Sequence, residues 1–523
     1  MTANIGIHFI DMLHWIFGPA EKVVLHHSSP ECSAGFLQLK GARVRYFLSV
    51  NAAHRPSPND NPMSPYRHLV INGEEFDFTN GFTDLHTLSY ERILAGRGFA
   101  VEDTACAVHT LDMLRKSAAV GLTGDYHPLR RNLQGGCEKR TGAMKMVDLH
   151  RQYLGIRDEV DRAIGDVMAE TAFIKGPAVG RFEEELARRL EVRHCIACGN
   201  GTDALLLSLL AVGLQRGDEV IVPAFAFAAV AETVLLLGGV PVFADVDPRT
   251  FNIDPASVAR LVSERTRVVI PVHLFGQPCD MAALTAVAKE HGLRVIEDNA
   301  QSLGAVCRMS DGASRYAGTI GEIGCTSFFP SKVLGCYGDG GAVFTDDDGL
   351  AARIRALGSH GWFPKYDSRL VGMNSRLDTL QAAVLRVKLP HLDTWIAARR
   401  SVAARYTERL GGLTPVVTPV ETPYATHVYH QYTVKVPPAC RDGLRAALAK
   451  EGIPSMVYYP GTLYEQPAYR DACICDPAMR HAAALPAAVL SLPMDSELTD
   501  AEVERVTDAV CRYFADNESR YHE

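Results

Sequence analysis

The chain has 523 residues, of which 47% are hydrophobic and 22% charged. This composition is typical of a soluble globular protein, and the length suggests two to four domains. The formal net charge of -8 argues against a general affinity for nucleic acid, and no apolar run reaches the length of a membrane span. The start, MTANIGIHF, lacks the regions of a signal peptide. We therefore predict a cytoplasmic protein with neither nucleic-acid nor membrane partners.

The thirteen cysteines have no repeating spacing, which fits a reducing compartment better than a disulfide framework. The CxxC motif at Cys195 to Cys198 lies in a predicted strand, and no second pair follows at zinc spacing. Packing is therefore favoured over a metal or redox role for this pair, and no metal site is predicted.

Residues 1–126 show the pattern of an antiparallel α+β domain. NIGIHFIDMLHWIFG has the apolar spacing of an amphipathic helix. Four strand-like runs follow, KVVLHH, SAGFLQL, ARVRYFLSVNAA and HLVINGEEFDF, and then two helical stretches, SYERILAGRGF and VEDTACAVHTLDMLRKSAAV. No G-x-G-x-x-G motif opens a βαβ unit here. Residues 127–143 are basic, contain glycine and lack periodicity, so we expect a linker.

The remaining chain divides in two. From Cys195 onwards, short apolar strands alternate with helices, which predicts a mostly parallel sheet with helices on both faces and a ligand at the carboxyl ends of the strands. After Arg376 a long helical segment and a small α+β region follow. We assign residues 144–390 to a large domain and residues 391–523 to a small one.

One lysine, Lys332, lies in SFFPSKVLGCYGDGG, between an aromatic strand end and a glycine-rich loop. A lysine held half-buried there has a lowered pKa and can act as an amine that forms an imine with an aldehyde. The natural aldehyde is pyridoxal phosphate. A solvated surface lysine beside a turn is the alternative, so other residues must decide between the two.

Further candidates for the same cofactor lie at other strand ends. In GNGTDAL, Gly201 and Thr202 enter a helix whose free N–H groups and dipole favour a phosphate. Asp298 ends an apolar strand and can keep a pyridine nitrogen protonated, which makes the ring withdraw electrons. Gln301 can donate to the phenolic oxygen of that ring.

An aromatic side chain and two hydroxyls complete the set. Phe227 can stack on the ring, and Ser327 and Ser331 can reach the phosphate. Each candidate alone has an ordinary explanation: a helix N-cap, a strand cap, a packed aromatic or a solvent-facing serine. Their joint occurrence at successive strand ends favours a pyridoxal phosphate site.

From Met144 to the C-terminus the chain resembles the DegT/DnrJ/EryC1/StrS sugar aminotransferases. The matching stretches are FIKGPAVGRFEEELA, GNGTDAL, VPAFAF, PVHLFGQPCDM, IEDNAQSLGA, SFFPSK and GDGGA. The resemblance implies a fold-type I enzyme that uses pyridoxal 5'-phosphate. It makes Lys332 the Schiff-base lysine, Asp298 the partner of the ring nitrogen and Gln301 the contact to the ring oxygen. By the same resemblance, Thr202 and Ser327 hold the phosphate and Phe227 stacks on the ring.

The resemblance also implies a shared site. GMNSRLD, Gly372 to Asp378, matches a segment that crosses from the neighbouring subunit, so Asn374 is expected to reach the partner's phosphate in a homodimer or larger homo-oligomer. Arg376 and Tyr459, the latter in a variable YYP loop, are expected to bind substrate. Related dehydratases carry histidine in place of the lysine, so Lys332 favours transamination. Ala226, where threonine is common, leaves the sugar specificity open.

Residues 1–126 resemble the C-terminal half of the Gfo/Idh/MocA oxidoreductases, particularly those that oxidise UDP-N-acetylglucosaminuronate at the sugar 3-position. The stretches concerned are NIGIHFIDMLHWIFG, SYERILAGRGFAVEDT and GLTGDYHPL. In that family the histidine matching His8 lies beside the reacting carbon; a packed helix face is the alternative for His8 and Asp11. The nucleotide-binding half and its lysine are missing, so hydride transfer by this chain alone is not expected.

These observations predict a ping-pong amino transfer from a donor, glutamate, to a keto group of a nucleotide sugar. The expected substrate is UDP-2-acetamido-3-keto-glucuronate, in cell-surface polysaccharide or lipopolysaccharide synthesis; a 4-keto nucleotide sugar is the alternative. Residues 1–126 are then an interaction or oligomerisation module that docks a sugar dehydrogenase, or a remnant of a gene fusion. A regulator that binds the cofactor without catalysis would need a DNA-binding region, and no helix-turn-helix with basic flanks is evident.

Overall fold

The computed structural model describes residues 7–28, 32–49, 68–71, 74–77, 101–117, 119–120, 125, 127 and 144–517. The chain divides into two compact units, Met1–Gly142 (unit 1) and Ala143–Glu523 (unit 2). Each unit is described by itself. Among the described residues, no helix combines the length and the apolar character that a membrane span requires.

In unit 1, two helices pack on a small antiparallel sheet, and their shared core includes Ile10, Leu37 and Leu111. The elements are α1 (Ile7–Phe17), β1 (Ala20–Ser28), β2 (Cys32–Leu39), β3 (Arg43–Ser49), the hairpin of β4 (His68–Ile71) and β5 (Glu74–Asp77), and α3 (Val101–Lys116). The antiparallel α+β arrangement expected here is confirmed for these elements. The helix expected at residues 89–99, the side chain of His8 and most of the expected linker lie outside the described residues.

Unit 2 is built on an eight-stranded sheet in the order β16-β8-β7-β9-β10-β13-β14-β6. Only β14 runs antiparallel to its neighbours, so the sheet is mostly parallel, as predicted. The bounds are β6 (His194–Cys198), β7 (Glu219–Pro223), β8 (Val240–Ala244), β9 (Thr266–Val269), β10 (Arg294–Asp298), β13 (Ile323–Ser327), β14 (Gly341–Thr345) and β16 (Ile474–Cys475). A separate hairpin joins β11 (Val306–Arg308) and β12 (Ser314–Tyr316).

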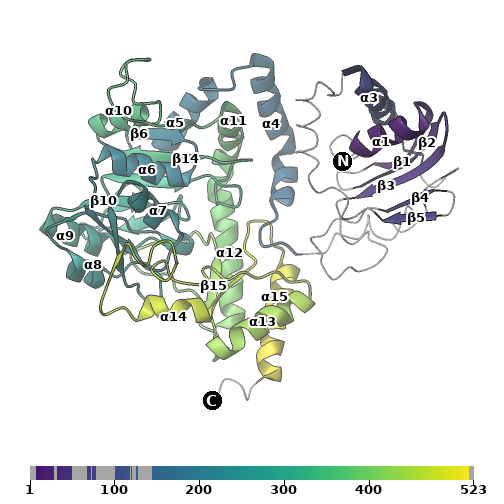
Figure 1. The fold of residues 1–523 in the computed structure, drawn as a ribbon. Helices are drawn as coiled ribbons and strands as arrows, with labels where there is room; N and C mark the ends of the chain where they lie inside the picture. The colour runs from purple at the N-terminus through teal and green to yellow at the C-terminus, as the bar shows by residue number, and fades with distance from the viewer. Residues whose placement is uncertain are drawn as a thin grey trace. The chain divides into compact units, whose positions relative to one another are not determined.

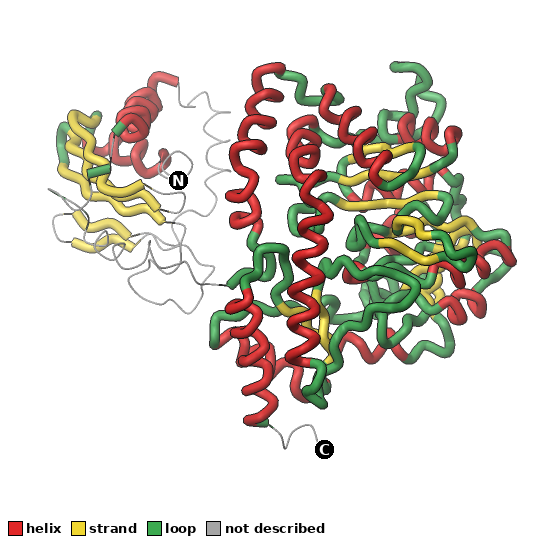
Figure 2. The backbone as a smooth tube through the Cα atoms, turned by 180° about the vertical axis from the view of Figure 1, so that it is seen from behind, coloured by secondary structure: helices red, strands yellow, loops and turns green. Residues whose placement is uncertain are grey.

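Helices cover both faces of this sheet, because alternate strand residues point to opposite sides. In β7, Val220 and Val222 belong to one buried cluster and Ile221 to another. The first cluster also takes in α6 (Gly201–Ala211), α7 (Ala229–Leu236), α10 (Asp348–Leu357) and α14 (His481–Ala488). The second takes in α5 (Pro177–Arg189), α8 (Pro255–Leu261), α9 (Met281–His291) and α11 (Thr379–Lys388). Figure 2 shows the strands of unit 2 lying among these helices.

The C-terminal part of unit 2 has a core of its own around Tyr406, Tyr432 and Phe514. It consists of α12 (Leu392–Leu410), the antiparallel pair of β15 (Tyr432–Lys435) and β17 (Val489–Leu492), α13 (Pro438–Lys450) and α15 (Asp500–Asp516). The long α4 (Leu149–Glu170) packs against α11. α11 and α12 run on in one line (Figure 1), joined by a 3-10 turn that contains Pro390.

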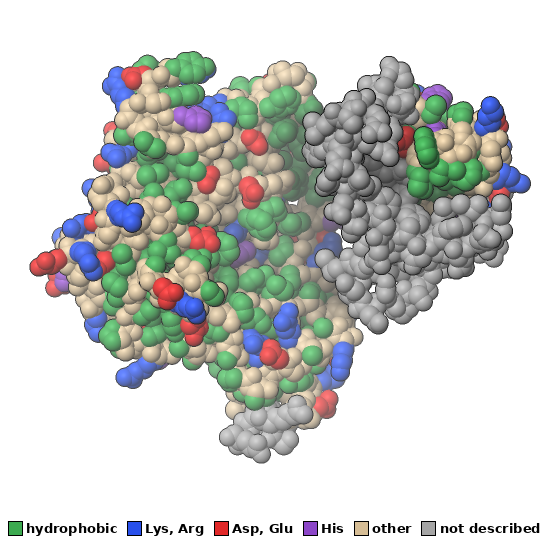
Figure 3. Space-filling model, in the orientation of Figure 1, with side chains coloured by type: hydrophobic (Ala, Val, Ile, Leu, Met, Phe, Trp, Pro, Cys, Tyr) green, Lys and Arg blue, Asp and Glu red, His purple; other side chains and the backbone are tan. Residues whose placement is uncertain are grey.

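Charged side chains of both signs are interspersed on the face of unit 2 shown in Figure 3, with basic and acidic groups next to one another. The surface ion pairs of unit 2 include Arg189 with Asp393 and Arg409 with Asp508. Such exposed pairs contribute little to stability.

Candidate functional site

The candidate site lies where β10 and β13, neighbours in the sheet, end together. Asp298 is the last residue of β10 and pairs with Cys325 of β13, whose last residue is Ser327. Lys332 follows in the loop after Ser327. Because parallel strands present their carboxyl ends at the same edge, the topology brings the predicted lysine and the predicted carboxylate to one place.

Lys332 and Asp298 interact electrostatically. Lys332 is half-buried, and burial lowers its pKa to about 8, although the carboxylate of Asp298 acts in the opposite direction. Asp298 is only 5% exposed, and burial raises its pKa. The hydrogen bond from the Ala300 N–H and the charges of Lys332 and His273 act in the opposite direction, but burial has the larger effect. The expectation of a half-buried lysine with a lowered pKa is confirmed. The amine is neutral in an appreciable fraction of molecules near neutral pH.

The carboxylate of Asp298 has one oxygen engaged and one free. Its Oδ1 accepts a hydrogen bond of 3.0 Å from the N–H of Ala300, and no described residue donates to Oδ2. The backbone is held on both sides, because the N–H of Asp298 donates to Pro271 (2.9 Å) and its carbonyl accepts from His273 (3.0 Å). A fixed, buried carboxylate with a free oxygen fits the nitrogen of a protonated pyridine ring.

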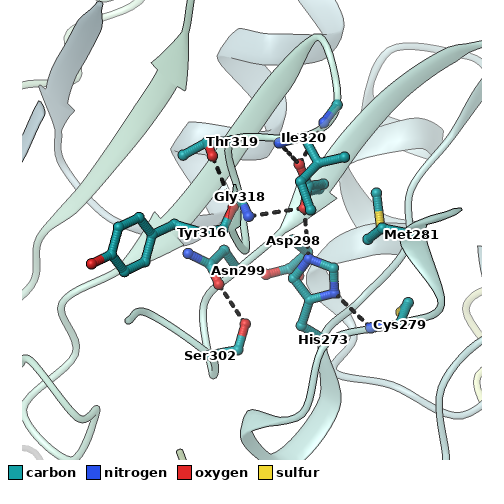
Figure 4. Close-up of polar contacts among 12 residues, drawn as sticks. His273, Cys279, Met281, Asp298, Asn299, Ser302, Tyr316, Gly318, Thr319 and Ile320 are labelled. Atoms are coloured by element: carbon teal, nitrogen blue, oxygen red, sulfur yellow. Dashed lines mark hydrogen bonds and ion pairs between the residues drawn. The ribbon is translucent and has the colours of Figure 1, made fainter. Parts of the chain in front are cut away.

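Glu297, the residue before Asp298, anchors this strand end, and sequence reasoning did not find it. Figure 4 shows the polar contacts at this strand end, with His273, Gly318 and Ile320 labelled. Its buried carboxylate accepts from His273 Nε2 (2.9 Å) and from the backbone N–H groups of Gly318 (2.8 Å), Ile320 (2.6 Å) and Gly321 (2.6 Å). A charged residue inside the apolar strand VIED was the available signal, since such a residue needs partners. The network fixes the position of Asp298.

The predicted phosphate turn lies at the start of α6. Asn200 caps the helix by accepting from the N–H of Asp203 (2.8 Å), while the N–H groups of Gly201 and Thr202 lie in the first turn, where no intrahelical acceptor exists. A Cβ at Gly201 would lie 2.8 Å from the Cβ of Ser327, so glycine is needed for the two elements to approach. The arrangement joins three predicted residues around free donors suited to a phosphate.

Ser375 supports this turn. It belongs to the segment Gly372 to Asp378, which was predicted to reach the site of a neighbouring subunit. Its hydroxyl accepts from the N–H of Gly199 (2.9 Å) and donates to Asp203 (2.7 Å). The preceding residue, Asn374, is exposed. Arg376 lines a cavity of about 240 Å³ between α5 and α10, which Lys332 and the other strand-end residues do not line. Among the described residues, no hydrogen bond or ion pair joins the side chain of Asn374 or Arg376 to Lys332.

Gln301, Tyr459 and Phe227 form a second group at the site. The Oε1 of Gln301 accepts from the N–H of Phe275 (2.7 Å), so its Nε2 is the donor, and it bonds the Tyr459 hydroxyl (3.2 Å). The ring centroids of Phe227 and Tyr459 are 6.3 Å apart, and Phe227 is 55% exposed. The structure thus brings together two predicted cofactor residues and one predicted substrate residue.

His430 is a further group near Lys332 that the sequence reading passed over. It is 6% exposed, its Nδ1 has no hydrogen-bond partner among the described residues, and burial lowers its pKa, with the charge of Lys332 adding to the effect. The N–H of Gln431 donates to Phe275 (3.2 Å), which places this segment beside the support of Gln301. The two histidines of HVYHQY were the available signal.

Comparison with known proteins gives a consistent result. Residues 155–511 match the model of the DegT/DnrJ/EryC1/StrS aminotransferase family. A pleiotropic regulatory protein of Geobacillus stearothermophilus is 44% identical over 71% of this chain and 98% of its own length. The UDP-2-acetamido-2-deoxy-3-oxo-D-glucuronate aminotransferase of Pseudomonas aeruginosa is 42% identical over 70% of this chain and 99% of its own length. The crystal structure of a DegT DnrJ EryC1 StrS aminotransferase from Brucella abortus has a TM-score of 0.67 and 40% identity, and covers 71% of this chain and 99% of that one.

Proposed function

The chain belongs to the DegT/DnrJ/EryC1/StrS aminotransferase family, and on that premise we propose that it transfers an amino group from glutamate to a keto group of a nucleotide-linked sugar. The chain is an enzyme, and the cofactor of its family is pyridoxal 5'-phosphate. Its mostly parallel sheet with helices fits the fold-type I aminotransferases.

The observation that carries the proposal is that Asp298 ends β10, that Lys332 follows the end of the neighbouring β13, and that the two groups interact electrostatically. The Nζ of Lys332, with a pKa of about 8, can give up and take back a proton, so it acts as the general acid and base at the amino-bearing carbon. Bound pyridoxal phosphate supplies an electron-withdrawing ring and a carbon that carries the amino group between substrates. The Oδ2 of Asp298, to which no described residue donates, would hold the proton on the ring nitrogen.

Other residues orient the cofactor and do not react. The N–H groups of Gly201 and Thr202 and the hydroxyls of Thr202 and Ser327 bind the phosphate, and the first turn of α6 adds its dipole. Gln301 is already oriented by Phe275 so that its N–H faces the site, where it donates to the ring oxygen. Phe227 stacks on the ring, and Tyr459 binds the sugar.

We propose UDP-2-acetamido-3-keto-glucuronate as the sugar, in cell-surface polysaccharide or lipopolysaccharide synthesis. The relative from Pseudomonas aeruginosa that is named for this substrate supports the choice. Purified protein should be given glutamate with either the 3-keto uronate or a 4-keto nucleotide sugar, and the products separated by mass. Amination of the 3-keto uronate is expected; amination of the 4-keto sugar alone would contradict the assignment and leave the amino transfer intact.

We also propose that a second copy of the chain completes the site, with Asn374 reaching the partner's phosphate and Arg376 its substrate. Large apolar side chains are exposed beside this segment: Phe173 is 40% exposed, Ile174 51% and Val371 94%. Ile174 forms a β-bridge with Asp378, which places Phe173 and Ile174 beside the end of this segment, whereas Val371 directly precedes Gly372 in the sequence. Burial of such side chains is the usual driving force for association, and closed homodimers are the commonest outcome.

For residues 1–126 we propose a Gfo/Idh/MocA fragment that docks a sugar dehydrogenase or joins copies of the chain. Its own core and its α+β order support an independent unit. Deletion of residues 1–142 should change the oligomeric state or abolish co-purification with the dehydrogenase. If neither changes, the segment is a remnant of a fusion. A cytoplasmic location stays a prediction from the sequence.

The relative named as a pleiotropic regulatory protein makes a cofactor-binding regulator the second candidate. A regulator needs to bind the cofactor without turning over an amino donor. Loss of the cofactor's visible band on addition of glutamate therefore separates the two functions.

A further inference from the structure

The loop that carries Lys332 closes on itself. Phe328 donates from its N–H to Gly340 (2.7 Å) and accepts at its carbonyl from the N–H of Cys336 (2.8 Å), while the N–H of Lys332 donates to Phe329 (2.9 Å). These bonds join parts of the loop to one another. The orientation of the whole loop therefore depends on contacts with other elements.

Helix α11 makes two such contacts. The ammonium of Lys388, in its last turn, donates to the carbonyl of Gly335 (2.5 Å). About two turns earlier in the helix, the Oε1 of Gln381 accepts from the N–H of Tyr337 (2.8 Å). Two successive parts of the loop backbone are thus tied to one helix.

Lys388 is unusual for a lysine. It is 1% exposed, and within unit 2 as described it forms no ion pair with a carboxylate. Its neighbours include the rings of Tyr337 and Trp395, whose centroids lie 4.9 Å and 5.8 Å from Nζ. Burial lowers its pKa to about 8. Burying an ammonium without a counter-ion costs free energy of folding, and an apolar side chain of similar size would avoid that cost. The presence of a lysine that bonds Gly335 therefore requires an explanation.

A short path of contacts leads from Lys388 to Lys332. Gly335 packs against the turn before it so closely that a Cβ there would lie 2.7 Å from the carbonyl oxygen of Phe329. That same oxygen accepts the N–H of Lys332. Movement of Gly335 would therefore be transmitted to the backbone of Lys332.

We propose that Lys388 and Gln381 are positioning residues, through which α11 fixes the lysine loop and holds the Nζ of Lys332 opposite Asp298. Neither residue touches the reacting atoms. The proposal rests on the proposed function, because the support matters for turnover only if Lys332 is the reacting group.

The test compares Lys388→Met with Arg386→Met in the full chain. Methionine keeps the length and apolar contacts of the lysine stem and removes the donor. Arg386, on the same helix, pairs with Glu185 (2.6 Å) and provides the control. In protein without added cofactor, amide exchange of residues 328–341 should become about tenfold faster in Lys388→Met and stay unchanged in Arg386→Met. In the loaded enzyme, kcat should fall about tenfold at unchanged KM for the nucleotide sugar.

The proposal would be overturned if residues 328–341 of a folded Lys388→Met protein exchanged their amide hydrogens at the wild-type rate. A lowered melting temperature with unchanged kcat would also overturn it. If Lys388→Met does not fold, Gln381→Leu replaces it, since Gln381 is half-buried and its loss removes the bond to Tyr337. An unchanged rate of amide exchange of residues 328–341 in Gln381→Leu would contradict the proposal in the same way. Because exchange is measured without cofactor, it separates failure of this proposal from failure of the proposed amino transfer, which would show as no turnover in the wild type.

Discussion

At the scale of single residues, the site depends on one amine and one carboxylate. Burial shifts the pKa values of these two groups in opposite directions. Burial lowers the pKa of Lys332 to about 8 and raises that of Asp298, and each charge offsets part of the other's shift. A buried pair of this kind costs stability before the cofactor arrives. In the proposed function, the bound cofactor would provide its ring nitrogen as the partner of Asp298 and its aldehyde as the partner of Lys332.

The first prediction concerns the titration of Lys332. In cofactor-free protein, uptake of pyridoxal phosphate needs the neutral amine, so its rate should rise with pH and level off above about 8. Since the folded pKa lies below the ordinary value of 10.5, the folded state binds fewer protons between these values and the free energy of unfolding rises with pH there. The rate of appearance of the visible band measures the uptake, with Nα-acetyl-lysine as the reference amine. A pH dependence of the uptake rate with its midpoint near 10.5, the ordinary pKa of lysine, would contradict a pKa lowered by burial.

The second prediction is that Asp298→Asn separates activity from stability. The amide keeps the shape but cannot hold a proton on the ring nitrogen, so turnover should fall about 100-fold or more. Because a buried carboxylate with a raised pKa costs free energy, the melting temperature of the cofactor-free variant should equal or exceed that of the wild type. Asp311→Asn, at an exposed turn, is the control. Near-normal turnover of Asp298→Asn would refute the assigned role.

Several site residues were predictable because they lie at or just after the ends of strands. Lys332, Asp298 and Gln301 are next to apolar runs and glycines, which mark the carboxyl edge of a parallel sheet. Glu297 and Ser375 were not, because their roles depend on partners far away in the sequence: Glu297 bonds the turn at residues 318–321, and Ser375 bonds Gly199. His430 needed the fold to show that it lies near Lys332.

At the scale of elements, the phosphate turn depends on the contact between the start of α6 and the end of β13. Gly201 allows that contact. The alternation of strands and helices predicted both elements. It did not predict β16, a strand of two residues at the sheet edge that is contributed by the C-terminal region, because so short a strand is defined only by its pairing with β8. It also missed the 3-10 turn at Pro390, where a helix-like pattern continues.

The third prediction tests this contact with Gly201→Ala. The added Cβ would lie 2.8 Å from the Cβ of Ser327, which is fixed at the strand end, so the free energy of unfolding should fall by about 1–3 kcal/mol. Affinity for the cofactor should fall as well. Gly165→Ala is the matched change, since this glycine is exposed within α4 with nothing near its Cβ position. It should raise the free energy of unfolding by about 0.5–1 kcal/mol. Equal effects of the two substitutions would disagree with a tight contact at Gly201.

At the scale of the whole molecule, no hydrogen bond or ion pair between described residues links the side chain of Asn374 or Arg376 to Lys332. Ser375 supports the chain's own phosphate turn, whereas the adjacent Asn374 is exposed and has exposed apolar side chains near it. This division follows if one segment serves two sites, its own and that of a second copy. The sequence could suggest a shared site only through the resemblance, because no local pattern marks a residue that acts on another chain.

The fourth prediction is complementation between two inactive variants. Lys332→Ala and Asn374→Ala should each lose activity. In a mixed dimer both changes fall in one site and the other is intact, so random assortment should restore about a quarter of wild-type activity. The measurement compares co-expressed chains with the two separate homodimers mixed without exchange. Activity no higher than the sum of the separate variants would contradict a shared site.

The central claim is that Lys332 holds pyridoxal phosphate for amino transfer, and the absorbance spectrum of the purified protein tests it most directly. After incubation with the cofactor, the wild type should show a visible band that glutamate removes, and Lys332→Ala should show none. A wild-type protein without such a band, or a band that glutamate leaves unchanged, would contradict the assigned chemistry.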